Sequence, residues 1–388
     1  MKPLHALVIG GGPAGLFFAY LMKKGSRASR VEVIEQNPPE ATFGFGVVLA
    51  DRGLERLASV DGELHRDICA GLRVNQHQMI YLEGESVCVD RVGYGGAIAR
   101  LDLLRILRQA CERAGVVITF AKRAEPSIDW LEADLVVGAD GVNSVVRSSD
   151  SAKFGSRTSS LTNHFAWYGT RARLPMAFLS FRTHGGGHFV AHGYPYSDDM
   201  GTLVAECDAA TWMRLGMASM DDAARRSLIE NIFVEELQGQ PLVNNKSAWR
   251  VFPVIENEHF HVGNRVLIGD ALHSAHFSIG SGTRIAMDDA QALHEAILTA
   301  ADVGSALESY TLARKPVKAK LLDAARASYT WYENFPAKMA CTDPLDFVYD
   351  FMRRTGRMTD ERLRLEHPAF MWRYEHRRRV VQPARVSV

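Results

Sequence analysis

Short apolar runs alternate with amphipathic stretches along the first part of the chain. Residues 4–9 form an apolar run short enough to be a strand buried on both faces, residues 16–24 predict a helix, and residues 31–34 predict a second strand. The pattern continues with an amphipathic helix predicted over residues 100–114 and strands over residues 116–120, 133–138 and 265–270. This alternation favours an α/β fold with a parallel sheet.

The pattern changes between residues 161 and 207. Antiparallel strands with polar, glycine-rich connections are predicted at residues 165–169, 177–181, 188–192 and 201–206. The α/β pattern then resumes, and the strand at residues 265–270 leads to a long helix predicted over residues 283–301. We therefore expect a Rossmann-like nucleotide-binding domain interleaved with an antiparallel β-sheet domain and followed by a helical segment.

The expected domain boundaries follow these changes of pattern. The nucleotide-binding domain is expected in three parts, residues 1–73, 99–160 and 263–304. The sheet domain, which we expect to bind substrate, takes residues 74–98 and 161–262, and residues 305–388 are expected to be helical. Helices are also predicted over residues 53–70 and 221–237.

A glycine-rich turn joins the first strand to the first helix. It reads Gly10-Gly11-Gly12-Pro13-Ala14-Gly15, and the second strand ends at Glu35. In this G-x-G-x-x-G arrangement Gly10 allows the tight turn, Gly12 lets the backbone approach a pyrophosphate, and Gly15 lets the helix pack closely on the sheet. Glu35 is placed to accept hydrogen bonds from ribose hydroxyls and disfavours a 2′-phosphate. A glycine-rich turn alone is a weak signal, but both strands and the acid in register predict a dinucleotide site.

Two further stretches point to the same ligand. Asp270 lies at the carboxyl end of a predicted strand, where α/β sheets bind ligands. Gly280, Gly282 and Thr283 lead into the long helix, whose N-terminus can approach a ring system and stabilise negative charge on it.

The composition limits the class of protein. The chain has 388 residues, 47% hydrophobic and 23% charged, with a net charge of zero, so no polyanion is implied as a general partner. The five cysteines (Cys69, Cys88, Cys111, Cys207 and Cys341) show no C-x-x-C spacing, which argues against a disulfide framework or a zinc site. No apolar run approaches about 18 residues and the first strand leaves no room for a signal peptide, so we expect a cytoplasmic protein. The basic cluster Arg377–Arg379 predicts a solvated tail, with a phosphate-binding patch as the alternative.

Together these motifs resemble the FAD-dependent class A aromatic hydroxylases, the group that includes para-hydroxybenzoate hydroxylase, over residues 4–300. The resemblance implies that Gly10, Gly12, Pro13, Ala14 and Gly15 hold the FAD pyrophosphate and that Glu35 holds the adenosine ribose. It implies that Arg100 contacts the FAD phosphates and ribityl region and that Asp270 binds the ribityl and pyrophosphate side. Asp140 and Gly141 resemble an Asp-Gly motif associated with both FAD and NAD(P)H, although a plain turn is the alternative for this pair.

Three segments resemble one subgroup in particular. Residues 43–48, 181–207 and 275–283 are similar to salicylyl-CoA 5-hydroxylase, to the N-terminal domain of anthraniloyl-CoA monooxygenase, and to the tryptophan-derived 5-hydroxylase of the violacein pathway. His276-Phe277 stands where the wider group usually has proline, so active-site detail does not transfer from para-hydroxybenzoate hydroxylase. The reductase-like second domain of some CoA-ester relatives is expected to be absent.

The resemblance implies a monooxygenase that uses NAD(P)H, O₂ and bound FAD to hydroxylate an aromatic ring through a flavin C4a-hydroperoxide. The first substrate class is an aryl-CoA thioester such as salicylyl-CoA. A tryptophan-derived indole is the alternative. A flavin-binding protein that does not hydroxylate is a further alternative, and the halogenase segment W-x-W-x-I-P is absent from the sequence. The cofactors are therefore FAD, bound, and NAD(P)H, transient.

Candidate substrate-side residues come from the sheet domain and from the loop before the long helix. His192 and Tyr194 alternate on one face of a predicted strand, and Tyr168 and Phe277 are aromatic candidates with packing as their alternative. A histidine here orients or deprotonates a phenol or indole, or else is a hydrogen-bonded structural residue. Gly46 and Val47 are expected near the flavin ring, because glycine here permits close backbone approach.

Overall fold

A mostly parallel sheet forms the part of the molecule that the sequence predicts to bind a nucleotide. The computed structural model describes residues 3–26, 29–41, 44–92, 95–126, 128–280, 282–341 and 343–381. The strands of this sheet are β1 (His5–Ile9), β2 (Arg30–Ile34), β8 (Val117–Thr119), β9 (Leu135–Gly138), β16 (His261–Val262) and β17 (Arg265–Leu267). Within the described residues their order is β16-β17-β9-β1-β2-β8, and all neighbours are parallel except β16 and β17. The carboxyl ends of β1, β9 and β17 therefore lie at one edge, where such sheets bind ligands.

Three helices pack together beside this sheet. They are α1 (Pro13–Gly25), α4 (Arg100–Ala114) and α10 (Gly282–Thr299), and α1 contacts both of the others. α1 begins with Pro13, whose ring favours the first helical turn, and it buries Phe17 and Phe18 almost completely. The apolar faces of strands and helices form one core, which positions the turn before α1.

The second part is the predicted antiparallel sheet. Its strands are β5 (His77–Leu82), β6 (Glu85–Asp90), β10 (Ser156–Thr170), β11 (Ala177–His184), β12 (Gly187–Pro195), β13 (Gly201–Cys207), β14 (Leu242–Asn244) and β15 (Arg250–Asn257). The order among the described residues is β14-β10-β13-β12-β11-β5-β6, with β15 on β10. One pair differs from the expectation, since β5 and β11 are parallel.

A small sheet links the two parts. It contains β3 (Gly46–Leu49), β4 (Arg73–Val74) and β7 (Gly96–Ala99), and both neighbours of β7 run antiparallel to it. The Gly46 N–H donates to Thr202 Oγ1 in β13 at 2.8 Å, so this sheet is tied to the antiparallel one.

The single helix predicted over residues 53–70 is two helices, α2 (Asp51–Val60) and α3 (Gly62–Ala70). The break falls at Asp61, whose side chain accepts hydrogen bonds from the backbone N–H groups of Glu63 and Leu64. A buried N-cap of this kind ends one helix and starts the next, which periodicity alone does not reveal.

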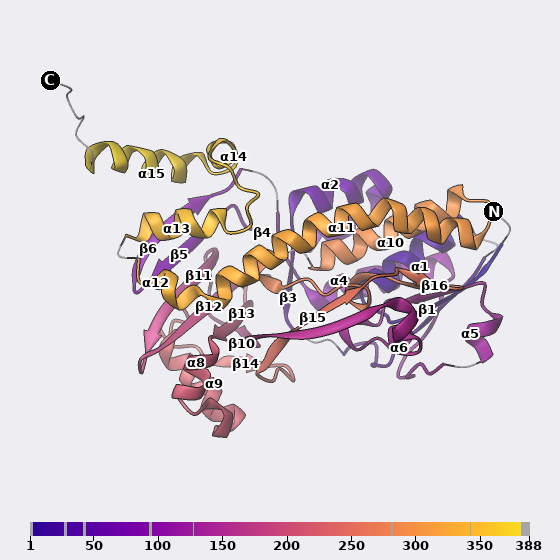
Figure 1. Cartoon of the computed structure of the whole chain (residues 1–388), viewed down its shortest axis with the longest axis horizontal. Coiled ribbons are helices and arrows are strands. Elements are labelled where there is room, and N and C mark those ends of the chain that lie inside the picture. The colour runs from indigo at the N-terminus through magenta and orange to yellow at the C-terminus, as the bar shows by residue number, and fades with distance from the viewer. Residues whose placement is uncertain are drawn as a thin grey trace.

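Helices cover both faces of the antiparallel sheet. α8 (Ala209–Arg214) and α9 (Asp222–Ile232) lie on one face, whereas the end of α11 (Val303–Glu333), α12 (Phe335–Met339) and α13 (Pro344–Arg353) pack on the other. The remaining helices are α5 (Ile128–Glu132), α6 (Val145–Ser148), α7 (Ser151–Phe154), α14 (Asp360–Glu366) and α15 (Pro368–Val381). Figure 1 shows α11 running along the long axis from the nucleotide-binding part to the C-terminal helices. This helix therefore contributes to both parts.

Some sequence-based assignments fall outside the described residues, namely those for Phe43, Ser281, the side chains of Arg378 and Arg379, and the last seven positions of the C-terminal segment. Arg377 forms an ion pair with Asp343. All five cysteines are free thiols. None of the described helices combines the length and apolar character needed to cross a bilayer.

Candidate active site

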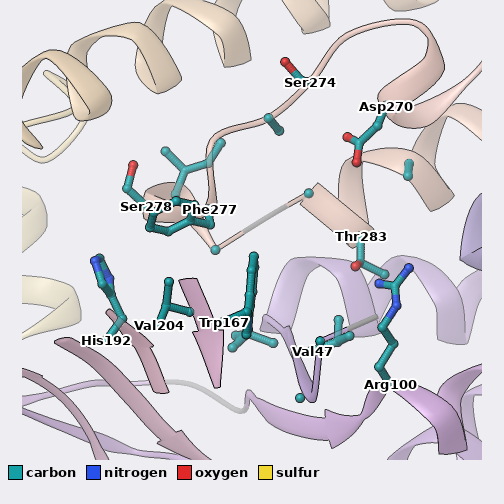
Figure 2. A pocket seen from close by; sticks show the side chains of 18 of the residues that line it. Val47, Arg100, Trp167, His192, Val204, Asp270, Ser274, Phe277, Ser278 and Thr283 are labelled. Atoms are coloured by element: carbon teal, nitrogen blue, oxygen red, sulfur yellow. The ribbon is translucent and has the colours of Figure 1, made fainter. Parts of the chain in front are cut away.

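A cleft of about 1420 Å³ lies between the parallel sheet and the antiparallel sheet. It collects most of the predicted site residues: Gly10, Gly12, Pro13, Ala14, Glu35, Gly46, Val47, Arg100, Asp140, Gly141, His192, Tyr194, Asp270, Phe277, Gly280, Gly282 and Thr283. Figure 2 shows side chains from both parts of the molecule facing this space. Segments far apart in the sequence thus line one continuous site.

The glycine-rich turn has the shape that a pyrophosphate site requires. Gly10 has φ +106°, and a Cβ there would lie 2.4 Å from the carbonyl oxygen of Ala139. Gly12 precedes α1 without a side-chain cap, and a Cβ at this position would meet nothing within 4 Å. The first N–H groups of α1 are therefore open to an anion.

Gly15 differs from its neighbours because it does not line the cleft. A Cβ on Gly15 would lie 2.0 Å from the carbonyl oxygen of Gly10. Its role in this structure is the close packing of α1 on the sheet, one of the two roles the motif implied, rather than contact with a ligand.

Glu35 is held at the edge of the cleft by its own loop. Its Oε2 accepts a hydrogen bond from the Gly11 N–H at 2.7 Å, and its Oε1 accepts from the backbone N–H and the side-chain amide of Asn37, each at 2.7 Å. Each carboxylate oxygen has two lone pairs, so Oε2 of the fixed carboxylate retains one acceptor position for a ligand hydroxyl.

Asp270 and Arg100 bring opposite charges to the middle of the cleft, where both side chains point into the open space (Figure 2). Asp270 is open to solvent on the cleft side and enclosed by protein elsewhere. This enclosure raises the pKa of its carboxyl, although the positive charges of Lys318 and Arg100 act to lower it. Loss of hydration lowers the pKa of Arg100, and the charge of Asp270 opposes that shift. The pair offers both a hydrogen-bond acceptor and a cationic donor to a polar ligand.

Asp140 retains an unused acceptor. Its Oδ2 accepts a hydrogen bond from the Val145 N–H at 2.7 Å, whereas its buried Oδ1 has no partner among the described residues. Burial raises the pKa of this carboxyl. A buried oxygen without a partner is costly in a cleft unless a ligand donates to it.

Gly46 is held in place by contacts from the antiparallel sheet. The Tyr194 hydroxyl donates to the Gly46 carbonyl oxygen at 2.9 Å, and a Cβ on Gly46 would lie 2.9 Å from Thr202 Oγ1 and 2.8 Å from a ring carbon of Tyr196. Burial raises the pKa of Tyr194 to about 12, so it remains a neutral phenol near pH 7. In this structure Tyr194 therefore fixes the backbone of Gly46 and Val47.

Aromatic rings surround the other end of the cleft. The Phe277 ring centroid lies 4.8 Å from that of Phe165, 5.9 Å from that of Trp167 and 5.4 Å from that of His192. His192 also stacks on Tyr332 at 5.2 Å. These residues form an apolar chamber with an imidazole on its wall.

Tyr168 lies outside this chamber. It is 3% exposed, belongs to the core beneath α9, and accepts a hydrogen bond from Trp249 Nε1 at 2.9 Å. Tyr168 is therefore a packing residue, which was the alternative to a substrate contact. Side chains alternate along β10, so Phe165 and Trp167 face the cleft whereas Tyr168 faces away from it. The two-residue period of the strand is the sequence signal that identifies them.

The loop before α10 is supported from the C-terminal helices. Gly280 has φ +57°, and a Cβ there would meet nothing within 4 Å. Arg354 donates hydrogen bonds to the Ser278 carbonyl oxygen at 2.8 Å and to Ser328 Oγ at 3.1 Å. Sequence reasoning found neither Arg354 nor Tyr332, because nothing local links them to a loop more than fifty residues earlier.

These observations fit FAD. A pyrophosphate matches the uncapped helix start at Gly12, and a flat ring matches the open space beside Gly280. Polyol hydroxyls can donate to the unpartnered oxygen of Asp140. The aromatic chamber belongs to the same continuous cleft as the Gly280 loop.

Comparisons with known proteins agree with this fit. Residues 112–325 match the family described as FAD binding domain. The chain is 35% identical over 359 residues to salicyloyl-CoA 5-hydroxylase of Streptomyces sp, covering 89% of this chain and 69% of that protein. It is 32% identical over 360 residues to protodeoxyviolaceinate monooxygenase of Chromobacterium violaceum, covering 90% and 94%.

A solved structure confirms the fold class. A variant of 2-methyl-3-hydroxypyridine-5-carboxylic acid oxygenase superposes with a TM-score of 0.71 at 18% identity, covering 93% of this chain and 96% of that one. The predicted resemblance to flavin-dependent aromatic hydroxylases is therefore confirmed. The chain belongs to the FAD-binding monooxygenase family, with FAD as its cofactor.

Proposed function

We propose that this monooxygenase hydroxylates the ring of an aryl-CoA thioester, with a salicyloyl-CoA-like ester first among the candidates. The observation that carries the proposal is the continuity of the cleft, which runs from the Gly10 turn past Asp270 into the chamber around Phe277. A relative that shares 35% identity over 89% of this chain is named for salicyloyl-CoA. Bound FAD supplies the redox chemistry, taking reducing equivalents from NAD(P)H and activating O₂.

We assign the cofactor side to residues already gathered in the cleft. Gly10, Gly12 and the start of α1 bind the pyrophosphate, and Glu35 accepts from the adenosine ribose. Arg100 and Asp270 bind the polar chain between the pyrophosphate and the ring, and Asp140 accepts through its free oxygen. The further contacts with the cofactor are assigned to Pro13, Ala14, Val47, Gly280, Gly282 and Thr283. The N-terminus of α10 stabilises negative charge on the reduced ring.

The substrate side is assigned to the aromatic chamber. Phe277 and Trp167 hold the substrate ring by stacking and edge contacts and exclude water from the reaction, and His192 meets the polar substituent of that ring. Tyr194 acts indirectly by holding Gly46. We also propose the domain division expected from the sequence. A cytoplasmic location is proposed as well, because a reducing compartment keeps the five cysteines as free thiols.

The test uses the purified protein loaded with FAD. NADH and NADPH oxidation are followed with salicyloyl-CoA, free salicylate and a tryptophan-derived indole, and products are examined by mass spectrometry. We expect the thioester to stimulate oxidation and gain one oxygen atom. Stimulated oxidation without an oxygenated product from any of these compounds would refute the proposal.

An indole substrate is the second candidate. It is favoured by the similarity to protodeoxyviolaceinate monooxygenase, which covers 90% of this chain. Preferential oxygenation of the indole over the thioester in the same assay would establish it instead.

A further inference from the structure

A buried carboxylate lies behind the aromatic chamber. Glu206 in β13 is 1% exposed, and its Oε1 accepts a hydrogen bond from the side-chain amide of Asn163 at 2.8 Å. Its Oε2 lies 3.3 Å from Nε2 of His192. No lysine or arginine in the described part of the chain forms an ion pair with Glu206, so the imidazole is the group placed to balance its charge.

The imidazole reaches from this carboxylate to the cleft. The His192 side chain is 13% exposed, lines the cleft, and packs between Tyr332 and Phe277. An ionised carboxylate only accepts hydrogen bonds, so Nε2 carries the hydrogen that faces Glu206. The neutral ring then has Nδ1 as its acceptor.

The other polar groups around His192 are poor proton acceptors. His276 on the loop before α10 contacts Ser278 Oγ through Nδ1 at 2.8 Å, and burial lowers its pKa to about 4. Tyr332 on α11 stays protonated, because burial raises its pKa. Arg354, after α13, is a cation that donates to neutral oxygens.

We propose that His192 and Glu206 form a proton-accepting pair for the substrate's ring substituent, with Glu206 as the positioning residue. The inference rests on the proposed function. The O–H bond of a phenolic substrate, or the N–H bond of an amino or indole group, breaks as the proton moves to the imidazole. The electron pair stays on the substrate heteroatom and enriches the ring that is to be hydroxylated. Glu206 stabilises the resulting imidazolium, which later releases its proton to water.

The test compares Glu206→Gln with His192→Gln in the FAD-loaded enzyme, using salicyloyl-CoA as the probe. Glutamine keeps an oxygen for Nε2 but removes the charge. We expect Glu206→Gln to lower kcat about tenfold with little change in KM, and His192→Gln to lower it about 10²-fold. Glu235→Gln is the matched control, since Glu235 is exposed and pairs with Arg182 away from the cleft.

The split between kcat and KM separates positioning from a structural role. A structural defect would lower the FAD absorbance or the melting temperature, whereas loss of the proton-accepting pair lowers kcat and leaves FAD binding, melting temperature and KM close to those of Glu235→Gln. An unchanged kcat in both variants, with FAD absorbance and melting temperature like those of Glu235→Gln, would overturn the inference.

The two proposals fail in different ways. If the wild-type enzyme oxygenates no aromatic thioester or indole, the proposed function fails before the variants are compared. If it oxygenates salicyloyl-CoA and both variants keep the wild-type kcat, only the proton-accepting pair is refuted. A variant that does not fold leaves the other as the deciding measurement, since His192 is partly exposed and Glu206 is buried.

Discussion

Asp289 in α10 offers the sharpest test of how the cleft is held together. The residue is 0% exposed, and its Oδ1 accepts from Nε of Arg314 at 2.9 Å and from a terminal nitrogen of the same guanidinium at 2.7 Å. Its Oδ2 lies 2.7 Å from Nζ of Lys318 and accepts from the Gly269 N–H at 3.0 Å. One carboxylate thus balances two buried cations and anchors the turn that carries Asp270.

Asp289→Asn should therefore be strongly destabilising. Removing one partner from a buried ion pair costs about 3–5 kcal/mol, since the remaining charge has no water to solvate it. Burial already lowers the pKa of Lys318 against the charge of Asp289. In the variant Lys318 is expected to release its proton, which keeps the cost within this range rather than doubling it.

The assay is urea unfolding of the apo protein followed by FAD titration. Asp288→Asn is the control, because Asp288 pairs with Arg284 and Arg56, whose side chains are 20% and 46% exposed and regain water. We expect a smaller loss of stability for the control, because both of its cations reach solvent although the Asp288 carboxylate is itself buried. We also expect Asp289→Asn to weaken FAD binding through the Gly269 turn. Equal unfolding free energies for the two variants would refute the reasoning.

Three further predictions concern the cleft and two buried histidines in the segment before α10. Gly12→Ala should fold like the wild type but bind FAD more weakly, because its methyl group meets no protein atom and enters the ligand space. Gly15→Ala should lower the melting temperature, because its methyl group meets the Gly10 carbonyl oxygen. Equal effects of the two variants in melting and flavin-fluorescence assays would contradict this. His273 and His276 have pKa values lowered by burial to about 2 and about 4. The unfolded chain therefore binds more protons than the folded chain below about pH 6.5. As the pH falls, each ring should lower the free energy of unfolding by about 1.4 kcal/mol per pH unit until its folded pKa is reached. A His273→Gln variant should reduce this slope in urea titrations between pH 7 and 5. Phe277→Ala should leave NAD(P)H oxidation active but release more peroxide per product, and an unchanged product yield would contradict its place in the chamber.

The nucleotide-binding half was readable because its signals are local. A strand, a glycine turn, a helix and an acid follow one another within the first 35 residues, and each residue type answers a short-range requirement such as the positive φ of Gly10. The turn and Asp270 line one cleft, as expected. The break at Asp61 was missed, because a cap depends on one side chain and not on periodicity.

The substrate half was less readable because its contacts depend on which strand faces meet and on neighbours that are remote in sequence. The sequence predicts His192 as a candidate but places Glu206 only within a strand. It favours Tyr168, whereas Trp167 on the opposite face of β10 lines the cleft. Nothing in the sequence places Tyr332 against His192.

Local sequence is enough to predict a dinucleotide ligand, the α/β framework and the residues of the phosphate turn, because these follow from backbone geometry over a few neighbouring positions, and FAD then follows from the family resemblance. Only the tertiary structure decided which faces of the antiparallel strands meet the cleft, which carboxylate stands behind the imidazole, and which C-terminal side chains close the chamber. Those choices depend on the register of neighbouring strands, as for His192 and Glu206, and on packing between segments more than a hundred residues apart, as for His192 and Tyr332, where register and burial, rather than local propensity, set the contacts.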